Sequence, residues 1–257
     1  MAALTFLGTG TSNGVPIIGC DCRTCTSIDP RDQRGRTSAV VRWNGATYLI
    51  DTATELRLQA RVIDLRAIDA VLMTHAHADH TGGFDDLRRF NELQQRRLPV
   101  YAGPETATIL GDRYAYAFDQ HFSFFGGKPD LDLFPIDGPF TPIADTIVPV
   151  PVIHGRAVVH GYRFGDLAYI TDAKTIPDTS VQLVEGVDTL VLNALRERPH
   201  PTHLSFAEAA AIAQRVGARQ VFLTHLSHET THTDAEALLP AGIRVAYDGL
   251  TIASQAG

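Results

Sequence analysis

A histidine-rich turn directly after an apolar run constrains this chain more than any other feature. Residues 68–73 read Ile-Asp-Ala-Val-Leu-Met, which is typical of a buried strand, and residues 74–80 read Thr-His-Ala-His-Ala-Asp-His. Imidazole and carboxylate groups are the protein ligands that zinc and manganese prefer. The ligand-type residues are His75, His77, Asp79 and His80. A polar loop rich in histidine by chance does not need the order of strand, ligands and glycine pair (Gly82-Gly83) seen here, so we predict two bound metals.

The length and charge of the chain narrow its class. A chain of 257 residues favours one large α/β domain over residues 1–257, able to bury about three quarters of its unfolded surface without disulfides. The net charge of −7 argues against extended nucleic acid as a partner, because a broad electrostatic grip needs a basic face. No apolar stretch approaches the roughly 20 residues that span a bilayer, and residues 1–8 read as a strand. We expect a soluble cytoplasmic protein without a membrane partner.

Short β-rich runs fall into two groups with helical patterns between them. The expected strands are 4–7, 38–43, 47–50, 70–74 and 100–101 in the first group, and 146–153, 158–164, 167–171, 189–193, 220–224 and 244–246 in the second. The expected helices are 54–63, 84–95 and 205–216. The third helix begins with a capping box, Ser205 with Glu208, and ends before Gly217. Hairpin turns are expected at Asn44-Gly45 and at 164–166. This pattern predicts two packed sheets covered by helices.

Three more ligand-type residues follow later strands, where α/β enzymes tend to place catalytic groups. They are His154, Asp172 and His225. Taken singly, a histidine at a strand end is more often a hydrogen-bonded structural residue. Together with the first cluster, the three residues supply what a dinuclear metal site still needs.

The three cysteines of the chain form one compact cluster, Cys20-Asp21-Cys22-Arg23-Thr24-Cys25. In a cytoplasmic protein such a cluster favours zinc over a disulfide. Structural zinc needs four ligands, and His228 is the preferred fourth, with His232 or Asp21 as alternatives. The alternative to a zinc site is a set of three reduced, unpaired cysteines on a loop, which we favour less.

On these residues the chain resembles the metallo-β-lactamase superfamily, whose signature is His-x-His-x-Asp-His followed by a later His, Asp and His. The resemblance covers essentially the whole chain and implies a four-layer αββα sandwich of two packed mixed sheets flanked by helices. It also implies two metal positions with a bridge, namely His75, His77 and His154 for one, Asp79, His80 and His225 for the other, and Asp172 between them. Asp51 matches an early aspartate that orients the site. An aspartate bridge in place of cysteine points away from the antibiotic-hydrolysing members.

The Cys-x-Cys-x-x-Cys element and residues 7–16 narrow the resemblance to the PhnP-type cyclic phosphodiesterases. That branch implies a structural zinc, held here by Cys20, Cys22, Cys25 and His228. The tRNase Z branch is similar in residues 7–16. PqqB-like proteins share the cysteine cluster without the full His-x-His-x-Asp-His set, so the complete set disfavours a non-catalytic interpretation.

The resemblance implies a metal-dependent hydrolase for a small cyclic phosphate such as 5-phosphoribosyl 1,2-cyclic phosphate. A hydroxide that bridges two divalent metals, Mn²⁺ or Zn²⁺, would attack phosphorus. Asp79 and His203 are the expected catalytic residues. His203 precedes a helix N-terminus, where backbone N–H groups favour phosphate, and can assist the leaving oxygen. His200 is the weaker alternative for that role.

Other functions stay open at this point. They are a cyclic-nucleotide phosphodiesterase, a thioester or lactone hydrolase, and a non-catalytic PqqB-like binding protein. tRNA 3′-end processing is less favoured, since the chain has no long basic arm. A homodimer is implied by resemblance alone. The aromatic segment 120–139 fits a lid, a dimer surface or a core plug equally well.

Overall fold

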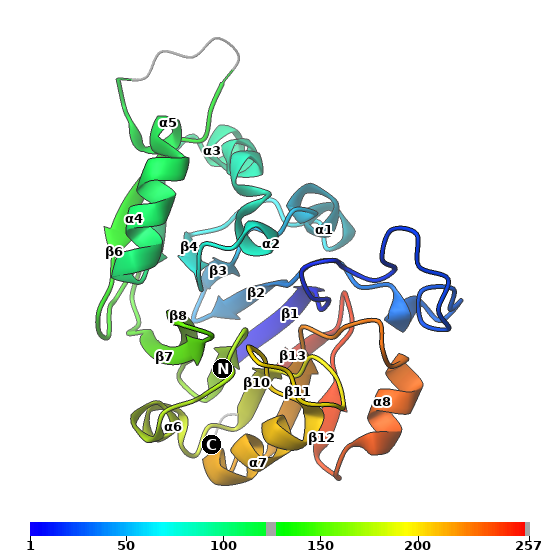
Figure 1. Ribbon diagram of the computed structural model, residues 1–257. Coiled ribbons are helices and arrows are strands. Elements are labelled where there is room, and N and C mark those ends of the chain that lie inside the picture. Colours follow the sequence, from blue (N-terminus) through cyan, green and yellow to red (C-terminus); the bar gives the residue numbers. More distant parts are fainter. Residues whose placement is uncertain (122–126, 255–257) are drawn as a thin grey trace.

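The computed structural model describes residues 1–121 and 127–254, and its strands form two sheets that pack face to face (Figure 1). The first sheet has the spatial order β13 (Thr251–Ala253), β1 (Ala2–Gly8), β2 (Ser38–Trp43), β3 (Ala46–Ile50), β4 (Ala70–Met73), β5 (Leu98–Ala102) and β6 (Leu131–Pro135). The second has the order β12 (Ile243–Val245), β11 (Gln220–Thr224), β10 (Thr189–Asn193), β9 (Leu167–Ile170), β8 (Ala157–Phe164) and β7 (Val148–His154). Each sheet contains antiparallel and parallel pairs, so both are mixed.

Helices cover the outer face of each sheet, which confirms the expected αββα sandwich. The first sheet is covered by α1 (Leu56–Val62), η2 (Phe84–Leu87), α3 (Arg88–Gln94), α4 (Pro104–Arg113) and α5 (Ala115–Phe118). The second is covered by α6 (Asp178–Val184), α7 (Phe206–Val216) and α8 (His232–Leu238). Two short elements lie in loops, η1 (Pro30–Asp32) and α2 (Ala78–Thr81).

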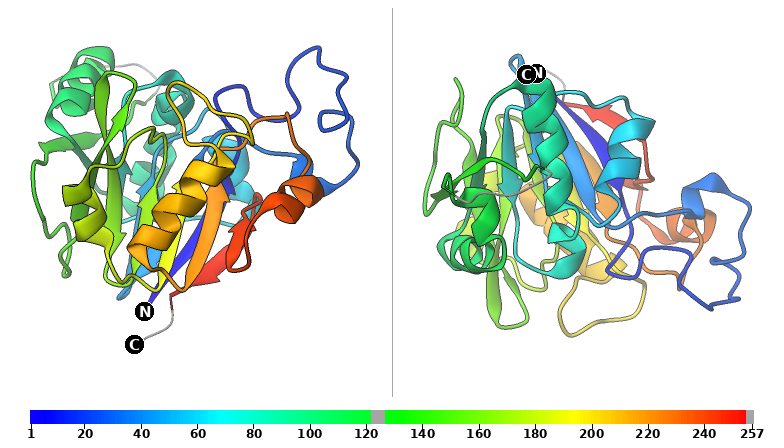
Figure 2. Two further views of the ribbon diagram at one scale, coloured as in Figure 1. Left: turned by 60° about the horizontal axis from the view of Figure 1, so that its bottom comes forward. Right: turned by 90° about the horizontal axis from the view of Figure 1, so that it is seen from above.

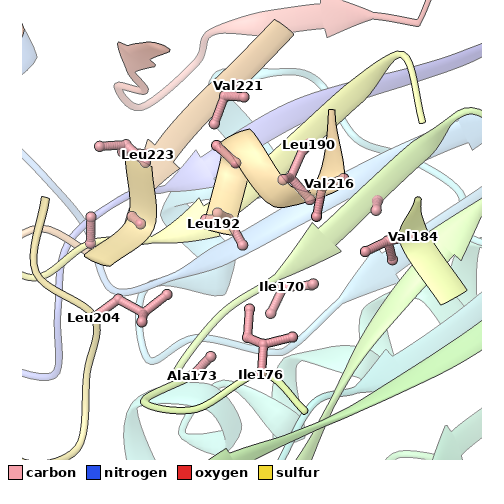
Figure 3. Close-up of a cluster of buried hydrophobic side chains, with 14 of the residues drawn as sticks. Ile170, Ala173, Ile176, Val184, Leu190, Leu192, Leu204, Val216, Val221 and Leu223 are labelled. Carbon is pink, nitrogen blue, oxygen red and sulfur yellow. The ribbon is translucent and has the colours of Figure 1, made fainter. Parts of the chain in front are cut away.

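The apolar residues divide among three buried layers because successive residues of a strand face opposite sides of a sheet. In β3, Tyr48 and Ile50 belong to the layer between the sheets, whereas Leu49 belongs to the layer under α1 and η2. The third layer lies between the second sheet and its helices, where Leu190, Leu192 and Val216 pack together (Figure 3). The two sheets therefore share one internal core. The single domain expected over residues 1–257 stays a prediction.

Local backbone geometry confirms the helix ends and the hairpin turn expected from the sequence. Ser205 Oγ accepts from the Glu208 N–H, Glu208 Oε2 accepts from the Ser205 N–H, and Gly217 ends α7 with φ of 73°. The β2–β3 hairpin turns through Asn44 (φ 48°) and Gly45 (φ 86°), the left-handed pair that its twist requires. The capping box therefore defines where the loop from β10 ends and α7 begins.

Several expected boundaries differ from the structure. The pattern over 84–95 is a 3₁₀ turn followed by a separate helix, and the strand expected over 146–153 starts at Val148 and includes His154. β6, β13, α4, α6 and α8 were not anticipated. Of the aromatic segment 120–139, residues 122–126 lie outside the described residues, and Leu131–Pro135 forms β6 at the edge of the first sheet.

None of the helices in residues 1–121 and 127–254 is both long enough and apolar enough to cross a membrane.

Candidate metal centre

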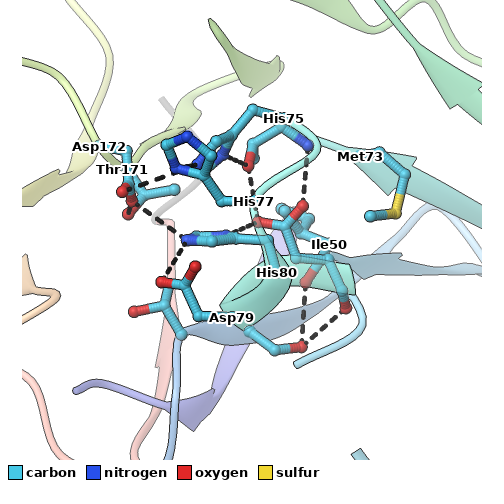
Figure 4. A network of polar contacts seen from close by, with 12 residues as sticks. Ile50, Met73, His75, His77, Asp79, His80, Thr171 and Asp172 are labelled. Atoms are coloured by element: carbon cyan, nitrogen blue, oxygen red, sulfur yellow. Dashed lines mark hydrogen bonds and ion pairs between the residues drawn. The ribbon is translucent and has the colours of Figure 1, made fainter. Parts of the chain in front are cut away.

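The histidine-rich turn leads from the end of β4 into the short helix α2, and its side chains converge on Asp172 (Figure 4). The glycine pair after α2 allows this turn to pack closely on residues 52–54. A Cβ atom on Gly82 would lie 2.5 Å from Thr54 Oγ1, and one on Gly83 would lie 2.3 Å from the Ala53 carbonyl oxygen. Both separations are shorter than real side chains permit, so glycine is required there.

The structure brings all seven expected catalytic-metal ligands together at the ends of strands from both sheets. They form overlapping groups whose ligand atoms lie within 4.8 Å of one another, namely His75 with His77 and His154, Asp79 with His80 and His225, and His75 with His80 and Asp172. One oxygen of Asp172 lies 3.4 Å from His80 Nε2, and the other lies 3.3 Å from His225 Nε2. The second oxygen is also 3.9 Å from His75 Nε2. Asp172 therefore stands between the groups, as a bridging ligand must.

Unpaired buried nitrogens show that this set fits divalent metal ions. Among the described residues, His80 Nε2, both ring nitrogens of His225 and His203 Nδ1 are buried without a hydrogen-bond partner. Leaving such an atom unsatisfied costs about 1–3 kcal/mol. Two ligand atoms on one tetrahedral ion lie roughly 3.3 Å apart when each bond is about 2.0–2.1 Å. The separations of 3.4 and 3.3 Å around Asp172 match that value, so a bound ion would satisfy His80 Nε2 and His225 Nε2.

Hydrogen bonds on the far side of two rings direct their remaining nitrogens into the cluster. Asp51 Oδ2 accepts from His80 Nδ1 at 2.7 Å, and the Thr74 N–H and hydroxyl both donate to the same carboxylate. His154 Nδ1 donates to the Thr202 carbonyl oxygen at 2.9 Å. In each case the other ring nitrogen keeps its lone pair for a metal.

Charge in the cluster is set by burial and by close partners. Burial lowers the pKa of His80, but Asp172 and Asp51 outweigh it and raise that pKa well above its usual value. Burial raises the pKa of Asp172, yet His225 and His80 hold it well below its usual range. A buried carboxylate surrounded by imidazoles is an environment that attracts a cation.

Backbone strain coincides with this site. Asp51, Asp172 and His225 have φ of 58°, 57° and 61°, and each follows the end of a strand. A residue with a Cβ atom in this left-handed region costs roughly 1–2 kcal/mol. Such residues persist where surrounding contacts hold them, and they are frequent at functional sites.

His203 lies inside the ligand cluster, whereas His200 lies beside it. His203 Nδ1 is 3.9 Å from Asp172 Oδ2 and within 4.8 Å of a His154 ring nitrogen. Burial is the main cause that lowers the pKa of His203 to about 3. The His200 ring is 5.2 Å from that of His203, and its Nδ1 accepts from the Thr202 N–H. Of the two histidines weighed from sequence, His203 is therefore the one that faces the ligands.

The cysteine cluster forms a second group of possible ligands, in the N-terminal loop beside α8 (Figure 2). His228 Nδ1 lies 3.3, 3.4 and 3.5 Å from the Sγ atoms of Cys20, Cys22 and Cys25. The Cys25 backbone N–H is the main cause that lowers the pKa of Cys22 to about 6. His232, weighed as an alternative ligand, instead accepts a hydrogen bond from the buried Arg34 guanidinium. Three thiol groups and one imidazole suit zinc.

Sequence reasoning missed the groups that support the ligands from behind. Thr171 Oγ1 donates to Asp172 Oδ1 at 2.7 Å, and the Asn193 amide pairs with both the N–H and the carbonyl of Ala173. The Thr202 carbonyl that supports His154 is a backbone group, which no residue type announces. Asn193 at the end of a buried strand was the one available signal.

Comparison with known proteins decides the family. Residues 46–226 match the family described as the beta-lactamase superfamily domain. The chain belongs to the beta-lactamase superfamily. Among solved structures it is similar to a diphosphatase from the PhnP family, with a TM-score of 0.90 and 41% identity over 98% of this chain and 96% of the other. The predicted resemblance to the superfamily and to its PhnP-type members is confirmed.

Two curated relatives extend this picture. An octanoyltransferase from Porphyromonas gingivalis is 38% identical over 95% of this chain, which spans only about half (50%) of that protein's length. A ribonuclease Z from Anoxybacillus flavithermus is 28% identical over 87% of this chain and 86% of its own length. Membership of the beta-lactamase superfamily and these ligand groups indicate a metal-dependent hydrolase domain with groups that could hold divalent metals such as zinc.

Proposed function

We propose that this hydrolase is a dinuclear-metal phosphodiesterase for a small cyclic phosphate, with 5-phosphoribosyl 1,2-cyclic phosphate as the first candidate. The observation that carries the proposal is the position of Asp172, which lies 3.4 Å from His80 Nε2 in one group of ligands and 3.9 Å from His75 Nε2 in the other, with His203 beside it. The names of the PhnP-family diphosphatase and of ribonuclease Z both denote cleavage of a phosphorus–oxygen bond. The net charge of −7 favours a small ester over RNA.

Each expected ligand has a place in this scheme. His75, His77 and His154 would hold one catalytic metal, Asp79, His80 and His225 the other, and Asp172 both. Two such ions, Mn²⁺ or Zn²⁺, supply a nucleophile near neutral pH and offset negative charge on the phosphoryl oxygens. Cys20, Cys22, Cys25 and His228 would hold a structural zinc. The homodimer and the cytoplasmic location stay predictions.

Two residues of the chain would act on protons during the reaction. Asp79 places one oxygen 3.5 Å from His80 Nε2, and its second oxygen would accept a hydrogen bond from the attacking water. Because the pKa of His203 is lowered to about 3, its ring is neutral at pH 7 and carries one N–H. That N–H would donate a hydrogen bond to the leaving oxygen and stabilise the negative charge that develops there.

Turnover of three ester classes tests this assignment. Wild-type protein and a His203→Ala variant are reconstituted with Mn²⁺ or Zn²⁺ and assayed on bis(p-nitrophenyl) phosphate, a thioester and a lactone. We expect metal-dependent cleavage of the phosphodiester, with His203→Ala retaining its metals but losing roughly 100-fold in kcat. His121→Ala is the control, because His121 is an exposed histidine in the chain segment just after α5. Cleavage of the thioester or lactone alone would contradict the proposal, and full activity of His203→Ala would remove His203 from it.

A further inference from the structure

The loop of residues 194–205, which connects β10 to α7, is called here the His203 loop. Its two ends are held by backbone hydrogen bonds. The Ala194 N–H donates to the Thr224 carbonyl, the Leu195 N–H to the Leu204 carbonyl, and the Leu204 N–H to the Ala173 carbonyl, all at 2.9 Å. These bonds fix both ends of the loop relative to the neighbouring strands and helix.

The tip of the His203 loop is held differently. Within the described residues, no backbone–backbone hydrogen bond involves residues 197–203. On the side of the metal centre, the His154 Nδ1–H donates to the Thr202 carbonyl oxygen. That contact joins His154 to the loop through the backbone of Thr202 alone.

Glu229 provides a second set of contacts to the loop, through the side chains of Arg196 and Arg198. Its Oε1 accepts from Arg196 Nη1 at 2.6 Å, and its carboxylate forms a two-point contact with Arg198 through Nε at 2.8 Å and Nη2 at 3.0 Å. Arg196 also donates from Nη2 to the Pro199 carbonyl oxygen at 3.3 Å. The side chains of Arg196 and Glu229 are only 18% and 29% exposed. The Arg198 side chain is 69% exposed, so the partly buried contact is the one with Arg196. One carboxylate shared by two guanidinium groups forms a small network, which is stronger than an isolated surface pair.

The position of Glu229 in the chain connects this support to both groups of ligands. It directly follows His228, whose Nδ1 faces the three cysteine sulfur atoms, and it lies four residues after His225. Between them, the Ser227 N–H donates to the Leu195 carbonyl oxygen at 2.9 Å. Residues 225–229 thus contact the catalytic ligands, the His203 loop and the cysteine cluster in turn.

We propose that Glu229 is a positioning residue that holds the tip of the His203 loop against the metal centre. By fixing Arg196 and Arg198, it keeps the Thr202 carbonyl behind His154 and keeps His203 facing Asp172. It also makes the cysteine cluster a remote anchor for the loop, since the same short segment carries His228. The effect on turnover rests on the proposed phosphodiesterase function, whereas the effect on the loop does not.

The test compares Glu229→Gln with Glu197→Gln in the fully metal-loaded protein. Glu197 lies on the same tip, between the two arginines, and its substitution makes the same change in charge. It is exposed and forms no ion pair within the described part of the chain, so it serves as the control. We expect Glu229→Gln to speed amide hydrogen exchange of Leu195, Leu204 and Phe206, whose N–H groups are hydrogen-bonded to the Leu204, Ala173 and Arg196 carbonyls. We also expect kcat to fall roughly tenfold with little change in KM, since small misplacements near the reacting groups cost rate. Its metal content should equal that of wild type. Glu197→Gln should match wild type in every readout.

Two further variants separate positioning from general destabilisation. Glu229→Asp keeps the charge and should recover part of the lost exchange protection and kcat. Arg198→Gln removes the two-point contact from the loop side and should reproduce part of the Glu229→Gln effect. The proposal is overturned if Glu229→Gln and Glu197→Gln have the same exchange rates at Leu195, Leu204 and Phe206. If the wild-type protein cleaves no phosphodiester, the proposed function fails, and the exchange experiment still decides the role of Glu229.

Discussion

His80 Nδ1 lies 2.7 Å from Asp51 Oδ2, and neither side chain is exposed to solvent. Because the Thr74 N–H and hydroxyl also donate to Asp51, the carboxylate has a fixed orientation. The contact in turn fixes the His80 ring with Nε2 toward Asp172. Asp51, which is not among the proposed metal ligands, thus determines the orientation of His80, which is one of them.

Substitution of Asp51 should weaken one catalytic metal selectively. In Asp51→Asn the His80 ring loses its charged acceptor, and we expect roughly a 10- to 100-fold loss of affinity at that position. Titration of metal-free protein with Mn²⁺ or Zn²⁺ by calorimetry measures this directly. Asp112→Asn, an exposed aspartate in α4, serves as the control. Identical titration curves for the two variants would refute the orienting role of Asp51.

Asp172→Ala should remove at least one catalytic metal. The side chain lies 3.4 Å from His80 Nε2 and 3.3 Å from His225 Nε2 in one group, and 3.9 Å from His75 Nε2 in the other, so its loss leaves the two groups without a shared ligand. The metal-to-protein ratio, measured by mass spectrometry of the metals after dialysis, should fall by one or more ions. Activity should fall with it. An unchanged ratio together with unchanged turnover would rule out Asp172 as the bridge.

His228→Ala should release one zinc ion and leave the catalytic metals bound. The variant keeps three thiol groups but lacks the fourth ligand of a closed tetrahedral site. Because binding of a structural zinc contributes to folding free energy, we expect a lower Tm in thermal unfolding. Zinc content and Tm are compared with those of His121→Ala. A variant that folds with its full zinc content and wild-type Tm would show that His228 is not a ligand.

Glu208 predicts a pH-dependent term in stability. Burial raises its pKa, but hydrogen bonds from Lys174 and Ser205 outweigh it, so the folded-state pKa lies below its ordinary value. The native state then binds fewer protons than the unfolded state, and the contribution is fully present above about pH 4.3 and lost as the pH falls through the folded-state pKa.

Glu208→Gln isolates that term, because glutamine retains the capping oxygen for Ser205 but not the charge for Lys174. The variant should be less stable than wild type by about 0.5 kcal/mol at pH 7, given that the pair is partly exposed. The difference should shrink as the pH is lowered from 7 to 3. Urea unfolding at both pH values measures it, and a difference that grows toward low pH would contradict the assigned direction.

The clustering of the proposed metal ligands was predictable because each is a distinctive residue type, either in the turn and short helix after β4 or at the end of a later strand. His154, Asp172 and His225 follow apolar runs, and the carboxyl ends of neighbouring parallel strands meet at one edge of a sheet. The capping box of α7 was predictable for a similar reason, since Ser205 and Glu208 make a purely local contact.

The supports of those ligands were not predictable in the same way. The carbonyl of Thr202 and the backbone of Ala173 act through groups that every residue carries. The ion pairs of Glu229 join residues more than thirty positions apart, and an Arg-Glu pair at that separation has no distinctive pattern. The strands β6 and β13 are short edge strands whose pairing depends on tertiary packing rather than on local preference.

The left-handed backbone at Asp51, Asp172 and His225 sets heat resistance and turnover against each other. Glycine adopts this conformation without steric cost, and at His225 it would also remove two buried ring nitrogens that have no hydrogen-bond partner among the described residues. A library selected only for resistance to heat in the absence of metal would therefore accept glycine at His225. A library selected for turnover would reject it, because the substitution removes a proposed ligand. Variants that unfold at a higher temperature but bind less metal would therefore mark the places where this chain gives up stability for chemistry.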